Sequence, residues 1–181
     1  MNSAMLEAAA TQDNIHTLTK RGITVLPTET GELACGEYGA GRLLPQDEIA
    51  LHCRRAVAEQ SLAGKRVLMT LGGTREYLDP VRFLGNASSG KMGLALATAA
   101  FMRGAEVTLV AGAVETPLPN IFAKVEKVTS AQQMLESAKE HFVNSDIAVF
   151  AAAVADVAPE SPATAKLASD QTPRLKLVKT P

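Results

Sequence analysis

The sequence has no tryptophan, few other aromatic residues and two cysteines. Because aromatic residues make up 4% of the chain while 46% of its residues are hydrophobic, alanine, valine and leucine must build most of any core. Cys35 and Cys53 are too few for a disulfide scaffold, which favours a reduced, cytoplasmic setting. Cys35 lies in a glycine-rich stretch typical of a reactive thiol, whereas the apolar helical spacing around Cys53 predicts packing.

The sequence also has no excess of charge of one sign and no long apolar run. The formal net charge is −1, which argues against a broad surface for nucleic acid or membrane. No uninterrupted apolar run is long enough to span a bilayer. The N-terminal residues include Glu7 and Asp13 and lack the basic start and apolar block of a secretory signal, so no signal peptide is predicted.

From residue 66 onward, strand and helix patterns alternate. The pattern predicts strands over 66–71, 107–111, 124–128, 146–153 and 175–178, and helices over 88–103 and 130–143. This alternation predicts a doubly wound, mainly parallel Rossmann-like α/β sheet. Ligands of such sheets bind beyond the carboxyl ends of the strands, where the loops after 71 and 153 would meet.

The preceding residues have a different pattern, which predicts two domains, 1–62 and 63–181. We expect helices over 8–20 and from Asp47, a strand over 23–26, a flap over 29–44, and a Pro-, Ala- and Ser-rich loop over 157–173.

The segment 85–93 reads Gly-Asn-Ala-Ser-Ser-Gly-Lys-Met-Gly and precedes a predicted helix. Ser88 or Ser89 can cap that helix, and its free N–H groups together with Lys91 favour an anion. It is not a P-loop, because Met92 follows the lysine, and the dinucleotide glycine fingerprint is absent. A phosphate cradle and a glycine-rich connection without a ligand are the two interpretations.

Two further groups of residues suit a nucleotide site. The small side chains of Ala151, Ala152 and Ala153 leave room for a base or ribose, and Asp156 can accept hydrogen bonds or simply cap the strand end. The sequence allows two roles for Arg75 and Arg82. They either bind phosphate or form structural ion pairs with the neighbouring Glu76 and Asp79.

The successive motifs Thr74-Arg75-Glu76, Asp79-Pro80-Val81-Arg82 and Asn86-Ala-Ser-Ser-Gly-Lys-Met-Gly93 resemble phosphopantothenate–cysteine ligase, the amide-forming enzyme of coenzyme A synthesis. In bacteria this ligase is usually the C-terminal half of a bifunctional protein. The resemblance implies that CTP activates the carboxylate of 4′-phosphopantothenate as an acyl-cytidylate, with Mg²⁺ or Mn²⁺, and that cysteine then displaces the nucleotide.

The resemblance also implies roles for residues. Asn86 would hold the activated carboxyl group, Arg82 would bind substrate, and Lys166 would neutralise phosphate charge. The implied nucleotide contacts are Gly72, Gly73, Thr74, Ser88, Ser89, Gly90, Lys91, Ala151, Ala152, Ala153, Asp156 and Lys166. The family has further lysines just after the last of these, where this chain has Ala168 and Ser169, and no protein ligands for a metal are predicted.

Residues 1–45 resemble the other half of that bifunctional protein, the FMN-dependent phosphopantothenoylcysteine decarboxylase. Met1-Asn-Ser-Ala-Met5 matches a substrate motif and 31–42 matches the flap, which implies that Asn2 binds the substrate carboxylate and Cys35 supplies a proton. The flavin-binding strands and catalytic histidine of that half are missing here. We therefore expect an incomplete flavoprotein segment, with FMN bound only in the full-length protein.

The resulting expectation is a cytoplasmic fragment of this enzyme, homo-oligomeric in full length, with small-molecule substrates. A non-catalytic nucleotide-binding α/β module is the alternative. A nicotinamide-dependent oxidoreductase is disfavoured, because the glycine fingerprint is absent.

Overall fold

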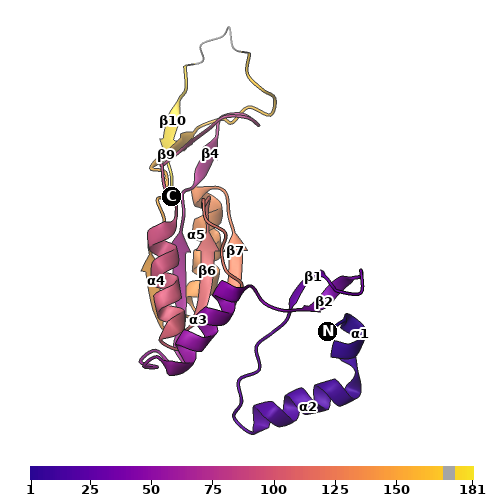
Figure 1. Ribbon diagram of the computed structural model, residues 1–181. Coiled ribbons are helices and arrows are strands. Elements are labelled where there is room, and N and C mark those ends of the chain that lie inside the picture. The colour runs from indigo at the N-terminus through magenta and orange to yellow at the C-terminus, as the bar shows by residue number, and fades with distance from the viewer. Residues whose placement is uncertain (169–173) are drawn as a thin grey trace. The chain divides into compact units, whose positions relative to one another are not determined.

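The computed structural model describes residues 1–168 and 174–181, which form two compact units, 1–54 and 55–181 (Figure 1). The first unit contains α1 (Ser3–Glu7), α2 (Ala9–Lys20) and an antiparallel pair, β1 (Glu29–Glu32) and β2 (Tyr38–Arg42). The helix α3 (Gln46–Val57) contains the boundary between the units. Within the described residues, no helix has the length and apolar character needed to cross a membrane.

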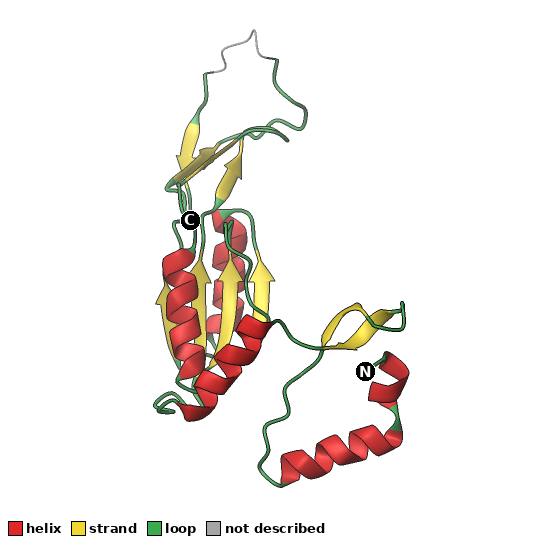
Figure 2. Cartoon of the chain, in the orientation of Figure 1, coloured by secondary structure: helices red, strands yellow, loops and turns green. Residues whose placement is uncertain are grey.

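The second unit is built on a four-stranded parallel sheet. Its strands are β3 (Arg66–Leu71), β6 (Glu106–Ala111), β7 (Lys124–Lys127) and β8 (Ile147–Phe150), in the order β7-β6-β3-β8. The helices α4 (Lys91–Met102) and α5 (Ala131–Phe142) lie in front of the sheet and behind it (Figure 2). The predicted fold class, a doubly wound α/β sheet, is confirmed.

The strand order places a switch point between β3 and β8. After β3 the chain moves outward on one side through β6 and β7, and it then returns to β8 on the other side of β3. Loops that leave β3 and β8 therefore diverge at the carboxyl edge, which is where open parallel sheets bind ligands.

The core between sheet and helices comes from the apolar runs that predicted the strands. Leu68, Val110 and Met134 form a buried cluster, so β3 and β6 contact α5. The start of α5 is fixed by a capping box: the Ser130 hydroxyl accepts a hydrogen bond from the Gln133 N–H at 3.2 Å, and the Gln133 side chain accepts one from the Ser130 N–H at 3.3 Å. The helix predicted over 130–143 is confirmed.

Two small antiparallel ribbons stand beyond the carboxyl edge of the sheet (Figure 2). One joins β4 (Arg75–Tyr77) to β5 (Phe83–Gly85), and the other joins β9 (Val157–Pro159) to β10 (Leu177–Lys179). The loop predicted over 157–173 thus begins with a strand, and its residues 169–173 lie outside the described residues.

Two local predictions in the first unit are wrong. Residues 23–26 form no strand. Because no sheet packs against this segment, the side chains of Ile23 and Val25 are exposed. The segment 29–44, expected as a loop or flap, contains the β1–β2 hairpin, with Glu32 opposite Tyr38 in register. In addition, Cys53 is exposed rather than packed.

Arg55, at the end of α3, caps the end of α4. Its guanidinium donates hydrogen bonds to the carbonyls of Phe101, Gly104 and Ala105 at 2.6, 2.9 and 3.0 Å. We expect Arg55→Ala to lower the free energy of unfolding by about 2 kcal/mol, because charged hydrogen bonds to three backbone carbonyls at and just after the end of α4 are lost. Urea denaturation checks this, and exposed Arg54→Ala, which should change stability little, is the matched control.

Candidate functional site

The loop after β3 is tied to both neighbouring strand ends through two glycines. The Gly73 N–H and carbonyl exchange hydrogen bonds with Ala113, at 3.0 and 2.8 Å, and the Gly72 carbonyl accepts one from the Ala153 N–H at 2.8 Å. Gly72 has a φ of +80°, and a Cβ there would lie 2.5 Å from the Ala113 carbonyl oxygen. Glycine is therefore required at position 72, both by backbone conformation and by space.

The two predicted motifs meet beside this loop. The Thr74 hydroxyl, which is buried, accepts a hydrogen bond from the Ala155 N–H at 2.9 Å. The Asn86 side-chain amide donates one to the Val154 carbonyl at 2.9 Å. Residues 72–74, Asn86 and 153–155 are thus neighbours at the switch point, as expected from parallel strands that end at one edge.

The start of α4 differs from the prediction. The helix begins at Lys91 rather than near 88, and its N-cap is Gly90, with a φ of +75° and no side-chain cap. Ser88 and Ser89 therefore do not cap the helix; their hydroxyls accept hydrogen bonds from the N–H groups of Gly90 and Lys91 at 3.3 and 3.5 Å. A left-handed glycine makes the turn instead, which leaves the helix start uncapped by side chains and suited to an anion.

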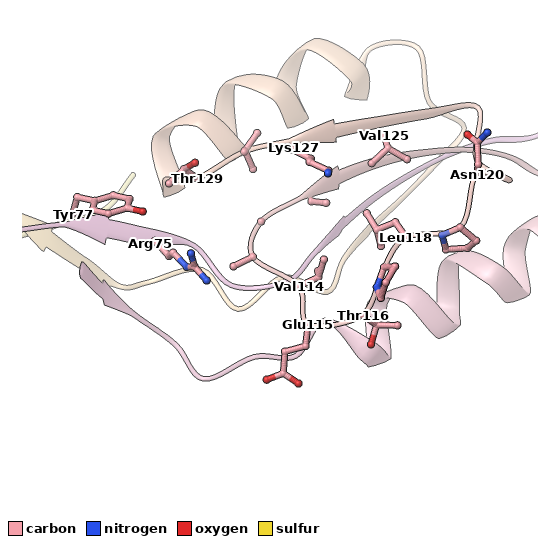
Figure 3. Close-up of a pocket in the computed structure, with 16 residues that line it drawn as sticks. Arg75, Tyr77, Val114, Glu115, Thr116, Leu118, Asn120, Val125, Lys127 and Thr129 are labelled. Atoms are coloured by element: carbon pink, nitrogen blue, oxygen red, sulfur yellow. The ribbon is translucent and has the colours of Figure 1, made fainter. Parts of the chain in front are cut away.

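A pocket of about 560 Å³ lies between these elements. It is lined by Gly73, Thr74, Arg75, Phe83, Gly85, Asn86, Ala87, Ser88, Ser89, Ala113, Val114 and Glu115. A larger pocket of about 780 Å³ shares Arg75 and residues 113–115 with it and extends to Asn120 and Lys127 (Figure 3). No motif in the sequence predicts the larger pocket, which is lined largely by residues 111–120. We take the smaller one as the candidate site because it holds the motif residues.

Arg75 points into the larger pocket in Figure 3, and its guanidinium carbon lies 4.7 Å from the centre of the Phe83 ring. The structure does not show the ion pair between Arg75 and Glu76 that was one of the two predicted alternatives. Glu76 is buried, and its carboxylate accepts a hydrogen bond from the Ala131 N–H, at the start of α5, at 2.8 Å. Arg75 therefore remains available to a ligand phosphate.

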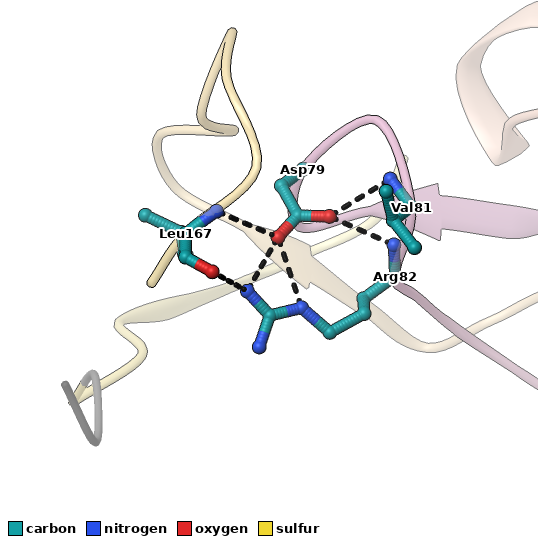
Figure 4. A network of polar contacts seen from close by, with 4 residues as sticks. All are labelled: Asp79, Val81, Arg82 and Leu167. Atoms are coloured by element: carbon teal, nitrogen blue, oxygen red, sulfur yellow. Dashed lines mark hydrogen bonds and ion pairs between the residues drawn. The ribbon is translucent and has the colours of Figure 1, made fainter. Parts of the chain in front are cut away.

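Arg82 does pair with Asp79. Its Nε and Nη2 donate to Asp79 Oδ2 at 2.9 and 2.5 Å, and Nη2 also donates to the Leu167 carbonyl at 3.1 Å (Figure 4). The Asp79 side chain is completely buried, whereas 41% of the Arg82 side chain is exposed. The structural pairing is thus the observed role of Arg82, and substrate binding through its exposed part stays a prediction.

The Arg82 guanidinium, helped by the N–H groups of Val81, Arg82 and Leu167, holds the pKa of Asp79 well below its usual range. A depressed pKa means that the ionised carboxylate stabilises the fold above the unfolded value near 4, and that this contribution is lost as the pH falls further. We expect Asp79→Asn to lower the free energy of unfolding at pH 7, with a difference from wild type that shrinks below about pH 4. Urea denaturation at pH 7, 5 and 3 measures it. A difference that grows on acidification would contradict this assignment.

Among the remaining predicted residues of the second unit, Lys91, Asp156 and Lys166 are exposed, whereas Ala151 and Ala152 are half-buried. Lys91 opens α4, Asp156 follows the buried Ala155, and Lys166 precedes Leu167. Ala151 and Ala152 lie just past β8, which ends at Phe150 rather than at the predicted 153. Among the described residues, no group of three or more His, Cys, Asp and Glu side chains is placed to hold a metal ion.

Asn2 and Cys35 line one pocket of about 430 Å³ in the first unit, together with Arg42. The Asn2 side chain caps α1 by accepting a hydrogen bond from the Met5 N–H at 2.8 Å. Cys35 is exposed, and its thiol donates to a Glu37 carboxylate oxygen at 3.5 Å. The two residues predicted from the decarboxylase resemblance are thus brought together.

Comparison with known proteins agrees with this architecture. Residues 62–181 match the family described as the DNA/pantothenate metabolism flavoprotein C-terminal domain. The coenzyme A biosynthesis bifunctional protein CoaBC of Vibrio cholerae is 42% identical over all of this chain and 46% of its own length. That of Mycobacterium tuberculosis is 45% identical over 92% of this chain and 41% of its own length.

A solved structure extends the likeness to the fold. The crystal structure of a CoaBC C-terminal domain has a TM-score of 0.58 and 42% identity, and it covers 67% of this chain and 57% of that chain. The chain spans a little under half the length of the curated relatives it matches. The family predicted from the motifs is confirmed: the chain belongs to the DNA/pantothenate metabolism flavoprotein C-terminal domain family.

Proposed function

We propose that the second unit carries the nucleotide site of a phosphopantothenate–cysteine ligase of coenzyme A biosynthesis. CTP binds at the carboxyl edge of β3 and β8, and the carboxylate of 4′-phosphopantothenate attacks its α-phosphate, which releases pyrophosphate and leaves an acyl-cytidylate. The amine of cysteine then displaces CMP and forms the amide. The observation that carries this proposal is the meeting of the glycine loop at 72–74, Asn86 and residues 153–155 beside one pocket.

The chemistry of these residues suits a reaction that needs charge neutralisation rather than a side-chain nucleophile. Lys91 and Lys166 supply positive charge for the phosphates, and the uncapped start of α4 supplies N–H groups. The Asn86 amide nitrogen is bonded to the Val154 carbonyl, which leaves its side-chain oxygen and second N–H for the reacting carboxyl group.

A divalent cation is implied by the family reaction. The described residues hold no cluster of His, Cys, Asp and Glu suited to a metal, so phosphate oxygens and water would supply most of its ligands, as is common for Mg²⁺. In the first unit, a pocket of about 430 Å³ with Asn2 and Cys35 is the part of a decarboxylase site that this chain contains. We assign no flavin chemistry to it.

A pyrophosphate-release assay tests the proposal. Purified chain is mixed with phosphopantothenate and each nucleoside triphosphate in turn, and cysteine is added last. We expect pyrophosphate with CTP before ATP, and the amide product only after cysteine is added. CTP binding without pyrophosphate would favour the alternative of a non-catalytic nucleotide-binding module, and no CTP binding would overturn both.

A further inference from the structure

The segment that carries Lys166 is attached to the β4–β5 hairpin by its backbone. The Leu167 N–H donates to Asp79 Oδ2 at 3.2 Å, and the Leu167 carbonyl accepts from Arg82 Nη2 at 3.1 Å (Figure 4). Closer to the start of the segment, the Ala163 N–H donates to the Leu78 carbonyl at 2.8 Å. One carboxylate and one guanidinium thus hold both polar backbone groups of the residue after Lys166.

Asp79 is built to keep one orientation. Its Oδ1 accepts hydrogen bonds from the N–H groups of Val81 and Arg82, each at 2.8 Å, while Oδ2 accepts from the Arg82 side chain and from Leu167. Because the side chain is fully buried, rotating it away would leave a charge without partners in the interior. The carboxylate is therefore a fixed anchor for the Leu167 backbone.

The same hairpin leads directly into the candidate site. Asp79 and Arg82 lie in its turn, whereas β5 ends at Gly85, one residue before Asn86. The β4–β5 hairpin therefore supports two parts of the site. Its last strand leads into Asn86, and its turn holds the backbone next to Lys166. A long, flexible lysine gains most from such support, because fixing its backbone reduces the entropy lost when the ammonium binds a phosphate.

We propose that Asp79 is a positioning residue: with Arg82 it clamps the Leu167 backbone and so directs the Lys166 ammonium to the nucleotide phosphates. The inference rests on the proposed function, since it concerns the same CTP site. It assigns Arg82 a role through Lys166, besides the direct substrate contact that stays a prediction. The competing explanation is that the clamp only stabilises the fold.

A double-mutant cycle separates these explanations. CTP affinity is measured calorimetrically for wild type, Asp79→Asn, Lys166→Ala and the double variant. We expect each single change to weaken CTP binding by about tenfold, and the double variant to bind no more weakly than Lys166→Ala alone. Additive losses, about 100-fold in the double variant, would overturn the positioning role. A wild-type chain that binds no CTP would instead overturn the proposed function.

Arg82→Lys is the second variant, in case Asp79→Asn fails to fold. It keeps the positive charge beside Asp79 but lacks the fork that bonds Asp79 and Leu167 together, so CTP binding should weaken and again depend on Lys166. Lys176→Ala is the matched control, because this exposed lysine pairs with Glu160 at 2.7 Å and is outside the clamp. An equal loss in the control would mean that general positive charge, and not positioning, governs affinity.

Hydrogen exchange supplies a direct readout of the clamp. The Leu167 amide should exchange at least tenfold faster in Asp79→Asn than in wild type, while the amide of Leu68 in β3 stays protected. An unchanged Leu167 rate would overturn the clamp, whatever the CTP affinities are.

Discussion

Asn86→Asp is expected to lower the rate of pyrophosphate release by about 100-fold or more, and to weaken CTP binding much less. The change places a second carboxylate where the substrate carboxylate and the α-phosphate must approach each other, and like charges repel strongly in a partly closed site. It also removes the amide donor that bonds the Val154 carbonyl at 2.9 Å. Steady-state kinetics and calorimetry on the same variant measure the two effects.

Asn86→Ala separates the charge from the lost hydrogen bond. It removes the bond to Val154 without adding a carboxylate, so its rate should lie between those of wild type and Asn86→Asp. Equal losses of CTP affinity and turnover in the Asp variant would contradict a role for Asn86 at the reacting carboxyl group.

Gly93→Val is expected to lower the free energy of unfolding by roughly 3 kcal/mol and to abolish measurable CTP binding. A Cβ at Gly93 would lie 2.5 Å from the Leu71 Cβ and 3.6 Å from the Ala151 Cβ, so α4 must move away from the sheet. That movement displaces the start of the helix, where the phosphates are proposed to bind. Urea denaturation and calorimetry check both parts.

Ala95→Val is the matched control for that substitution. It adds a β-branched side chain to the same helix at an exposed position, so it should change stability by at most about 0.5 kcal/mol and leave CTP binding intact. If both variants lose similar stability, the close approach of α4 to β3 is not the cause.

The sheet and its helices could be predicted because three of the four strands are short apolar runs and each helix has its own start or stop signal. Ser130 and Gln133 form a capping box within four residues, which is local information. The meeting of the two loops at the site could be predicted because both follow strands of one parallel sheet. The site-residue roles themselves come from the family resemblance and stay predictions.

What escaped prediction depends on partners far along the chain. The strands of the β4–β5 ribbon are three residues each and show no clear alternation. The buried carboxylate of Glu76 accepts a hydrogen bond from the Ala131 N–H, 55 residues away, and Asp79 adds to its local bonds with Val81 and Arg82 one from the Leu167 N–H, 88 residues away. The choice of Gly90 over a serine as the cap of α4 depends on a left-handed backbone turn, and glycine and serine in sequence permit either solution.

The hydrogen bond between the Thr74 hydroxyl and the Ala155 N–H joins residues that are 81 positions apart. At a ribosomal rate of about 5–20 residues per second, the glycine loop is synthesised roughly 4–16 s before its partner. During that interval β3 has no neighbour on the β8 side, and the nascent chain exposes the glycine loop of the proposed nucleotide site without the residues after β8. The switch point therefore closes only after β6 and β7 have been synthesised.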